Sequence, residues 1–215
     1  CGATVLLLGK TQSKLEVVYD EIEALGLALP AILPMDLERA DFAQMQKLAG
    51  LIEKEFGHLD GVLHNAAILG ALTPLEMYDP ITFEQVMRVN MTAVFMLTQS
   101  LIPLLRAARS GSVVFTSSSV GARPRAFWGA YALSKQAVEG MATIFTQETQ
   151  NMTALRFNCI NPGATRTNMR AHAFPGEDPY TPKTPEDIMP VYVYLMTDEA
   201  SGIKGQVIDC QPKNT

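Results

Sequence analysis

The sequence predicts an α/β protein with a doubly wound parallel sheet. Short apolar runs alternate along the chain with longer stretches in which apolar residues recur at helical spacing. The run at residues 4–8 is continuously apolar, as expected for a strand that is covered on both faces. Regular alternation of such strands with helices is typical of βαβ units. No internal repeat or low-complexity segment interrupts the pattern, so we expect the 215 residues to form a single domain.

The sequence predicts six short strands. The strands are expected at residues 4–8, 28–35, 61–64, 112–116, 155–160 and 206–209. The expected helices lie between them and carry apolar residues along one face. They are expected at residues 14–25, 42–56, 82–109 and 131–149, and from residue 185 onward.

Capping signals predict where several helices begin. Ser13 precedes Glu16 by three residues, which is the spacing of a capping box. A second pair with this spacing begins at Thr82 and opens the longest helix. Pro185 follows Thr184, and proline is favoured at the first position of a helix.

The beginning of the pattern is unusual for a doubly wound sheet. The strand at 4–8 leads into a helix without a glycine-rich turn. In the strand order 3-2-1-4-5-6, strand 1 lies in the middle of the sheet, and its loss would leave two unpaired inner edges. We therefore expect roughly 30 to 40 residues, about one βαβ opening, to precede Cys1 in the natural protein. An intact mass near 23.5 kDa for active protein would contradict this expectation.

Composition and charge exclude several classes of protein. The net charge of −5 and the pI near 5.2 argue against nucleic acid or an anionic membrane as a partner. No apolar run is long enough to cross a membrane, and residues 1–30 do not show the charged-then-apolar pattern expected of a signal peptide. The three cysteines, Cys1, Cys159 and Cys210, are far apart, which argues against a disulfide framework or a metal site. We expect a cytoplasmic protein.

Four polar residues form the candidate catalytic set. Tyr131 and Lys135 are four residues apart on an expected helix, so their side chains share one face. Alone, this pair could equally be solvated. Ser118 lies thirteen residues before Tyr131, just past a strand, and Asn90 lies in the long helix. Open α/β sheets bind their ligands at the carboxyl ends of the strands, where we expect these residues to lie.

With these residues in this order, the sequence resembles the short-chain dehydrogenase/reductase family over essentially its whole length. Ser118, Tyr131 and Lys135 match the catalytic serine, tyrosine and lysine of the family, and Asn90 matches its helix asparagine. Segments 64–66 and 160–167 are most similar to a bacterial subgroup, the YciK-like oxidoreductases. The resemblance implies a Rossmann-like NAD(P)-binding domain, although the glycine-rich T-G-x-x-x-G-x-G turn of the family is absent from residues 1–215.

The resemblance also implies a cofactor site, which Tyr131 and Lys135 share. Its other residues are Asp36, Leu37, Asn65, Ala66, Pro162, Gly163, Thr165 and Thr167. Ala67 departs from the glycine usual in the family, and we expect its methyl group to be tolerated.

The end of the strand at 4–8 predicts which nicotinamide cofactor is preferred. Enzymes that use NAD place an acidic residue there for the ribose 2′-hydroxyl, whereas a basic residue suits the 2′-phosphate of NADP. The strand runs into Gly9-Lys10-Thr11, with no acidic residue before Glu16. We therefore predict that Lys10 binds the cofactor and that NADP(H) is preferred over NAD(H). The alternative is that Lys10 is an ordinary surface lysine.

The residue types predict a mechanism. A free tyrosine has a pKa of about 10, and a nearby lysine ammonium favours the phenolate. Tyr131 is thus expected to act as general acid/base, while Ser118 donates a hydrogen bond to the substrate oxygen. By resemblance, Lys135 binds the nicotinamide ribose and Asn90 holds a water molecule that links Lys135 to solvent. Alternatively, Asn90 is bonded to backbone. Ser118 has serine neighbours, and Gly121 three residues later supports its assignment.

The substrate side of the site is expected in two loops. Residues 169–190 hold five of the 13 prolines and are expected to form a mobile lid. In the loop before Tyr131, Phe127 and Trp128 are expected to form an apolar wall. Two arginines in that loop either face an anionic substrate or are simply exposed; they are Arg123 and Arg125. His172 is expected at the entrance or in solvent.

We expect an oxidoreductase that acts on a small carbonyl or secondary alcohol substrate. By resemblance, the helices at 82–109 and 130–150 form the faces of a homodimer or homotetramer. A first alternative is a protein that binds NADP(H) without turnover, for regulation or assembly. A second is a hydrolase with Ser118 as nucleophile, although Ser118 is not in a G-x-S-x-G turn.

Overall fold

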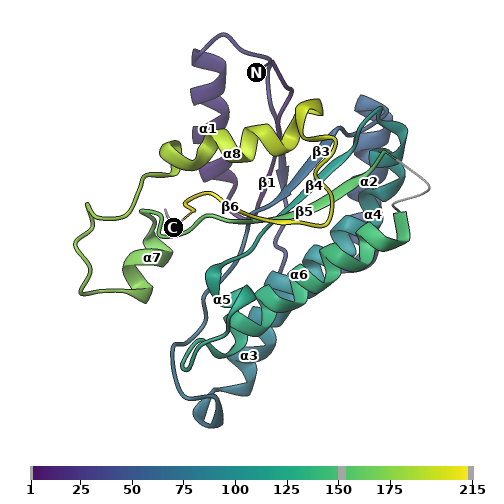
Figure 1. Cartoon of the computed structure of the whole chain (residues 1–215). Helices are drawn as coiled ribbons and strands as arrows, with labels where there is room; N and C mark the ends of the chain where they lie inside the picture. The colour runs from purple at the N-terminus through teal and green to yellow at the C-terminus, as the bar shows by residue number, and fades with distance from the viewer. Residues whose placement is uncertain (1, 150–153, 213–215) are drawn as a thin grey trace. The chain divides into compact units, whose positions relative to one another are not determined.

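The computed structural model describes residues 2–149 and 154–212, and Cys1 therefore lies outside the described residues (Figure 1). The chain divides into two compact units, residues 1–41 and residues 42–215. All of the strand pairs in both units are parallel, which confirms the expected α/β class.

The first unit is a strand–helix–strand motif. β1 (Leu6–Gly9) pairs with β2 (Ala31–Pro34), and α1 (Gln12–Ala24) contacts both strands. The capping-box prediction at Ser13 is wrong, because α1 begins at Gln12 and its N-cap is Thr11, without a side-chain hydrogen bond. Only two residues connect β1 to α1, so the helix begins before Ser13.

The second unit contains a four-stranded sheet in the order β3-β4-β5-β6. These strands are β3 (Gly61–His64), β4 (Ser112–Thr116), β5 (Arg156–Asn161) and β6 (Val207–Asp209). The predicted bounds of β3 and β4 are confirmed, and those of β5 and β6 differ by one residue. β4 and β5 are almost fully buried, although β5 contains Arg156 and Asn158, whose side chains are hydrogen-bonded to backbone groups.

Helices cover both faces of this sheet. On one face, Val114 and Ile160 pack against Leu195 of α8 (Pro185–Met196). On the other, Phe157 stacks on Phe145 of α6 (Gly129–Thr149), with ring centroids 4.9 Å apart. On that same face, α4 (Ala93–Ala107) packs against α2 (Phe42–Phe56). The second unit thus has helices on both sides of a parallel sheet, as a doubly wound arrangement requires.

The long helix expected at 82–109 is interrupted. α3 (Pro80–Met87) is followed by η2, a π-helical turn (Arg88–Thr92), and only then by α4. The cap is also displaced, because the Asp79 carboxylate accepts a hydrogen bond from the Thr82 amide at 2.8 Å. Pro80 occupies the first helical position, where its missing N–H costs nothing.

The segment expected as a lid, 169–190, is partly helical. α7 (Asn168–Ala173) begins at a Thr167 side-chain cap, and α8 begins at Thr184, which forms a capping box with Asp187. The loop between α7 and α8 is visible at the left of Figure 1. Three further short elements carry weak sequence signals: α5 (Ser119–Ala122), η1 (Leu75–Met77) and η3 (Asp198–Ala200).

A buried arginine joins β5 to the end of α8. Arg156 is only 1% exposed and donates to the Thr197 carbonyl oxygen at 2.8 Å and to Ser110 Oγ at 2.5 Å. Burial lowers the pKa of its guanidinium, while the charge of Asp198 opposes that effect. A cation at this position satisfies carbonyl groups that the end of α8 leaves unpaired.

Candidate active site

Three of the four predicted catalytic residues meet in one pocket of the second unit. Ser118 follows β4 and caps α5, whereas Tyr131 and Lys135 lie one turn apart on α6. All three residues line a cavity of about 520 Å³. The Lys135 ammonium nitrogen lies 5.5 Å from the centre of the Tyr131 ring.

Tyr131 is held as a neutral phenol. Its side chain is almost fully buried, and burial raises its pKa above the usual value of about 10, while the hydrogen bond with Ser118 partly opposes that rise. At neutral pH the phenol therefore keeps its proton and can donate it. Formation of the phenolate requires a positive charge nearby, which Lys135 can supply.

Lys135 is a buried cation. It is 4% exposed and donates a hydrogen bond to the Thr116 carbonyl oxygen at 2.6 Å. Burial lowers its pKa from 10.5 to about 8, so the ammonium form still dominates at neutral pH. The Thr116 carbonyl at the end of β4 thus fixes the ammonium beside Tyr131.

Asn90 lies in the π-helical turn and is 1% exposed. Its amide nitrogen donates to the Ile68 carbonyl oxygen at 2.9 Å and to Ser134 Oγ at 3.1 Å. Its amide oxygen accepts from the Ile68 N–H at 2.9 Å. The side chain makes the backbone contact that the sequence left open as an alternative. It thereby fixes the loop after β3.

The neighbouring Ser117 has a different hydrogen-bond partner from Ser118. Its hydroxyl donates to Glu139 Oε1 at 2.5 Å, and Glu139 lies one turn beyond Lys135 on α6. A Cβ atom on Gly121 would lie 2.7 Å from both of these oxygens, so a side chain there would displace this hydrogen bond. Sequence reasoning missed Glu139, although its spacing from Lys135 was a usable signal.

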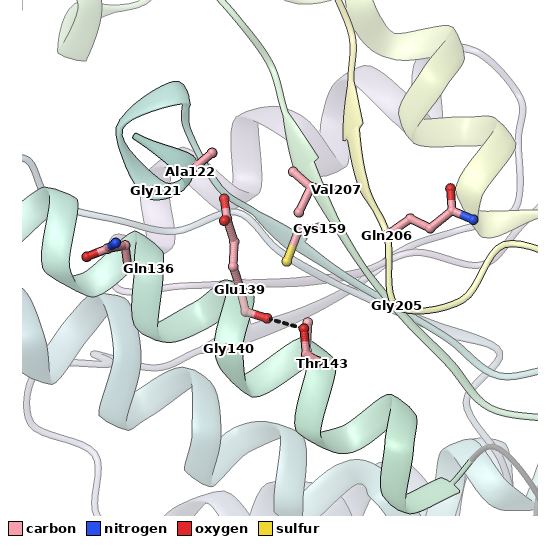
Figure 2. A pocket seen from close by; sticks show the side chains of 11 residues that line it. Gly121, Ala122, Gln136, Glu139, Gly140, Thr143, Cys159, Gly205, Gln206 and Val207 are labelled. Atoms are coloured by element: carbon pink, nitrogen blue, oxygen red, sulfur yellow. Dashed lines mark hydrogen bonds between the residues drawn. The ribbon is translucent and has the colours of Figure 1, made fainter. Parts of the chain in front are cut away.

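Glu139 also lines a second pocket. It has a volume of about 350 Å³, and its walls come from α5, α6, β5 and the start of β6. Figure 2 shows Glu139 extending from α6 toward Gly121 and Ala122, with Cys159 on the adjacent strand. Burial raises the pKa of the Cys159 thiol to about 12, so the thiol stays protonated and is a poor nucleophile.

The predicted cofactor residues of the second unit line the same pocket as Tyr131. They are Asn65, Ala66, Pro162, Gly163, Thr165 and Thr167. Asn65 Oδ1 accepts a hydrogen bond from Thr116 Oγ1 at 3.2 Å, which joins two strand ends. Gly163 has φ +71°, a conformation that side chains rarely adopt. Ala67 also lines this pocket.

Three predicted cofactor residues, Lys10, Asp36 and Leu37, belong to the first unit. Lys10 follows β1 and is exposed. Asp36 follows β2, where its carboxylate accepts a hydrogen bond from the Glu38 N–H at 3.0 Å, and Leu37 is partly buried beside it. Lys10 and Asp36 therefore follow the carboxyl ends of two adjacent parallel strands.

The loop before Tyr131 contributes one wall residue rather than two. Trp128 lines the pocket, with its ring centroid 6.0 Å from that of Tyr131. Phe127 is 57% exposed and is absent from the pocket lining. Arg123 and Arg125 are exposed, and the guanidinium of Arg125 lies 5.4 Å from the centre of the Trp128 ring. The expectation that these arginines are simply exposed agrees with this arrangement.

His172 is exposed and does not line the pocket, so Ser118 has no histidine beside it there. Within residues 2–149 and 154–212, no group of three or more His, Cys, Asp or Glu side chains could hold a metal ion. In the same part of the chain, no helix combines the length and apolar character needed to cross a membrane.

Comparisons with known proteins agree on one family. The family model described as short chain dehydrogenase matches residues 1–178. The uncharacterized oxidoreductase YciK of Escherichia coli strain K12 is 49% identical over 211 residues, which are 98% of this chain and 83% of the relative.

Two similar solved structures hold a nicotinamide nucleotide. A short chain dehydrogenase from Shigella flexneri 2a strain 301, complexed with NADP, is 49% identical with a TM-score of 0.94. One from Escherichia coli CFT073, complexed with NADPH, is 50% identical with a TM-score of 0.94. Each match covers 98% of this chain and 87% of the other. The chain belongs to the short-chain dehydrogenase/reductase family of oxidoreductases.

Proposed function

We propose that this protein is an NADP(H)-dependent oxidoreductase that interconverts a carbonyl compound and a secondary alcohol. The observation that carries the proposal is the cluster of Ser118, Tyr131 and Lys135 in one pocket. The phenol of Tyr131 is buried and hydrogen-bonded with Ser118, and a buried ammonium lies beside its ring. This arrangement suits proton transfer to an oxygen atom of the substrate.

The pocket fits the nicotinamide end of such a cofactor. Three of its lining residues have little or no side chain and so leave room for a flat ring: Ala66, Ala67 and Gly163. Gly163 has φ +71° and a Cβ atom there would lie 3.0 Å from Gln211 Nε2, so a side chain at this position would be strained. When bound, the cofactor supplies or accepts the hydride.

The protein's own groups handle the proton. In the reductive direction, Ser118 donates a hydrogen bond to the carbonyl oxygen and orients it. Tyr131 transfers its phenolic proton to that oxygen as negative charge develops there. The Lys135 ammonium stabilises the resulting phenolate. In the oxidative direction, the Tyr131 phenolate removes the hydroxyl proton of the alcohol.

Two observations support NADP(H) over NAD(H). Related structures contain NADP and NADPH, and Lys10 is exposed at the carboxyl end of β1, where a base suits a 2′-phosphate. The test is a titration of protein expressed from the complete gene with NADPH and NADH, read by Trp128 fluorescence. We expect tight binding of NADPH and weak binding of NADH. Lys10→Glu should remove the preference, and Lys14→Glu, also exposed, should not.

Substitution of Tyr131 by phenylalanine separates an enzyme from a protein that only binds the cofactor. The variant should lose about 10²- to 10⁴-fold in kcat, because no other group donates the proton. NADPH binding should persist, since the ring remains. Unchanged turnover would refute the assigned role of Tyr131.

We further propose a homodimer or homotetramer, a cover formed by residues 169–190, and a cytoplasmic location. The helices expected to form the subunit contacts expose apolar side chains: Phe95 on α4, and Leu133 and Ile144 on α6. Analytical ultracentrifugation of wild type and Ile144→Glu would test the assembly. Dissociation of the variant supports the proposed contact, and an unchanged mass contradicts it.

A further inference from the structure

We infer that the substrate is an uncharged carbonyl compound with an aromatic or other bulky apolar group, and that the ion pair between Arg170 and Glu177 prevents selection of anionic substrates. The inference rests on the proposed function and deepens it. Its support comes from the part of the 520 Å³ pocket that is lined by Trp128 and by α7 with Phe174 after it.

Aromatic and apolar side chains line this part of the pocket. The rings of Trp128 and Phe174 lie 5.8 Å apart, and Trp128 also lies 6.0 Å from Tyr131. Met169 and Ala173 of α7 pack on the same apolar cluster as Tyr131. A substituent next to a carbonyl held by Tyr131 would therefore contact aromatic rings, which favour flat or bulky apolar groups.

Two cations line the pocket among the residues that the structure describes, and both have partners. Lys135 is bonded to the Thr116 carbonyl and belongs to the catalytic end. Arg170 lies on α7, on the substrate side, so its state decides which charge the substrate can carry. No aspartate or glutamate is among the described lining residues.

Glu177 neutralises Arg170 through two parallel hydrogen bonds. Arg170 Nε donates to Oε2 at 2.7 Å, and Arg170 Nη2 donates to Oε1 at 2.5 Å. Both side chains are about three-quarters covered, at 26% and 25% exposure. The guanidinium also lies 3.7 Å from the centre of the Phe174 ring. A substrate carboxylate or phosphate would meet a guanidinium whose charge Glu177 already neutralises and whose Nε–Nη2 edge is occupied.

The other arginines near this region also have partners. Arg125 lies over Trp128 and donates to Ser119 Oγ at 3.3 Å. Arg166 donates to the Tyr180 carbonyl oxygen at 3.2 Å. Neither arginine lines the pocket. The described lining thus has no cation ready to receive an anion, and burial of an unpaired charge is unfavourable.

The test uses three ketones with protein expressed from the complete gene and NADPH. Methyl benzoylformate is aromatic and neutral, benzoylformate is the corresponding carboxylate anion, and methyl pyruvate lacks the ring. We expect kcat/KM for the aromatic ester to exceed that for the acid by about 100-fold. It should exceed that for methyl pyruvate by at least about tenfold.

Glu177→Gln should release the charge of Arg170 and raise the acid-to-ester ratio of kcat/KM by about tenfold or more. The double variant Arg170→Gln/Glu177→Gln also breaks the pair but leaves no charge, so its ratio should stay at the wild-type value. Glu186→Gln, an exposed change of the same kind on α8, is the matched control. Equal increases in the single and double variants would show a loosened pocket and overturn the role of the pair.

Kinetic measurements on the wild-type protein alone can contradict the proposed substrate class. Preference for the acid over the ester would do so, as would failure to reduce methyl benzoylformate by protein that binds NADPH. In both cases the proposed function would stand. Protein that binds neither NADPH nor NADH would instead refute the proposed function itself.

Discussion

Replacement of Lys135 by methionine should abolish turnover and yet stabilise the protein at pH 7. The lysine is 4% exposed, and burial lowers its pKa from 10.5 to about 8. That difference corresponds to a burial cost of about 3 kcal/mol for the charged form. Methionine removes this cost but leaves the Thr116 carbonyl without its hydrogen bond, a loss of about 1 to 2 kcal/mol. We therefore expect a net gain of about 1 to 2 kcal/mol in the free energy of unfolding.

This gain in the free energy of unfolding should become smaller as the pH rises. Below pH 8 the lysine is charged in the folded and unfolded states, so the full burial cost is present. Between pH 8 and pH 10.5 the folded protein releases the proton while the unfolded chain keeps it. The stability of the wild type therefore rises through this window relative to that of the variant. The Cys159 thiol, whose pKa is raised to about 12, acts in the opposite direction, but it is present in both proteins.

Urea unfolding at pH 7 and at pH 9.5 measures the two quantities. The advantage of Lys135→Met should be largest at pH 7 and should shrink at pH 9.5. Lys47→Met, the same change at an exposed position on α2, should show no such pH dependence. Turnover of Lys135→Met should fall by at least about 10²-fold. A difference in stability that does not vary with pH would refute the assignment of a lowered lysine pKa.

Two further substitutions test the packing around the site by urea unfolding. Asn90→Ala should lower the free energy of unfolding by about 2 to 3 kcal/mol, because the N–H and C=O groups of Ile68 lose their partners. NADPH binding should weaken as well. An unchanged stability and an unchanged NADPH affinity would contradict the positioning role of Asn90. Gly111→Ala should cost about 1 to 3 kcal/mol, because its Cβ would lie 2.4 Å from Leu155 Cδ2. Gly140→Ala, where the Cβ meets nothing within 4 Å, should be neutral or stabilising; destabilisation of both variants to the same degree would refute the steric argument.

The strands could be predicted from the sequence more reliably than the helix starts. A buried parallel strand is a continuous apolar run bounded by polar residues, and this pattern located β3 and β4. The capping-box spacing, in contrast, also occurs inside helices, where it has no capping role. At Thr82 the pattern was displaced by three residues, because Asp79 followed by Pro80 is the better start.

Local sequence patterns predict some residues of the candidate site but not others. The spacing of Tyr131 and Lys135 on α6 is local, so the sequence could place both side chains on one face. The contact between Ser117 and Glu139 depends on how α6 packs beside the end of β4, which no local pattern encodes. The pair of Arg170 and Glu177 likewise forms only after α7 ends and the chain turns back.

The π-helical turn at Arg88–Thr92 shows how a distortion can position several segments at once. A residue in an α-helix is rotated by about 100° from its predecessor, so one extra residue in a turn redirects the side chains there. Through this turn Asn90 reaches both Ile68 and Ser134. Ser134 lies between Tyr131 and Lys135 on α6, whereas Ile68 belongs to the loop that follows Asn65 and Ala66. One amide therefore ties the part of α6 that carries Tyr131 and Lys135 to a wall of the pocket. A regular helix at this point would aim the amide elsewhere and leave that loop without this hydrogen-bonded anchor.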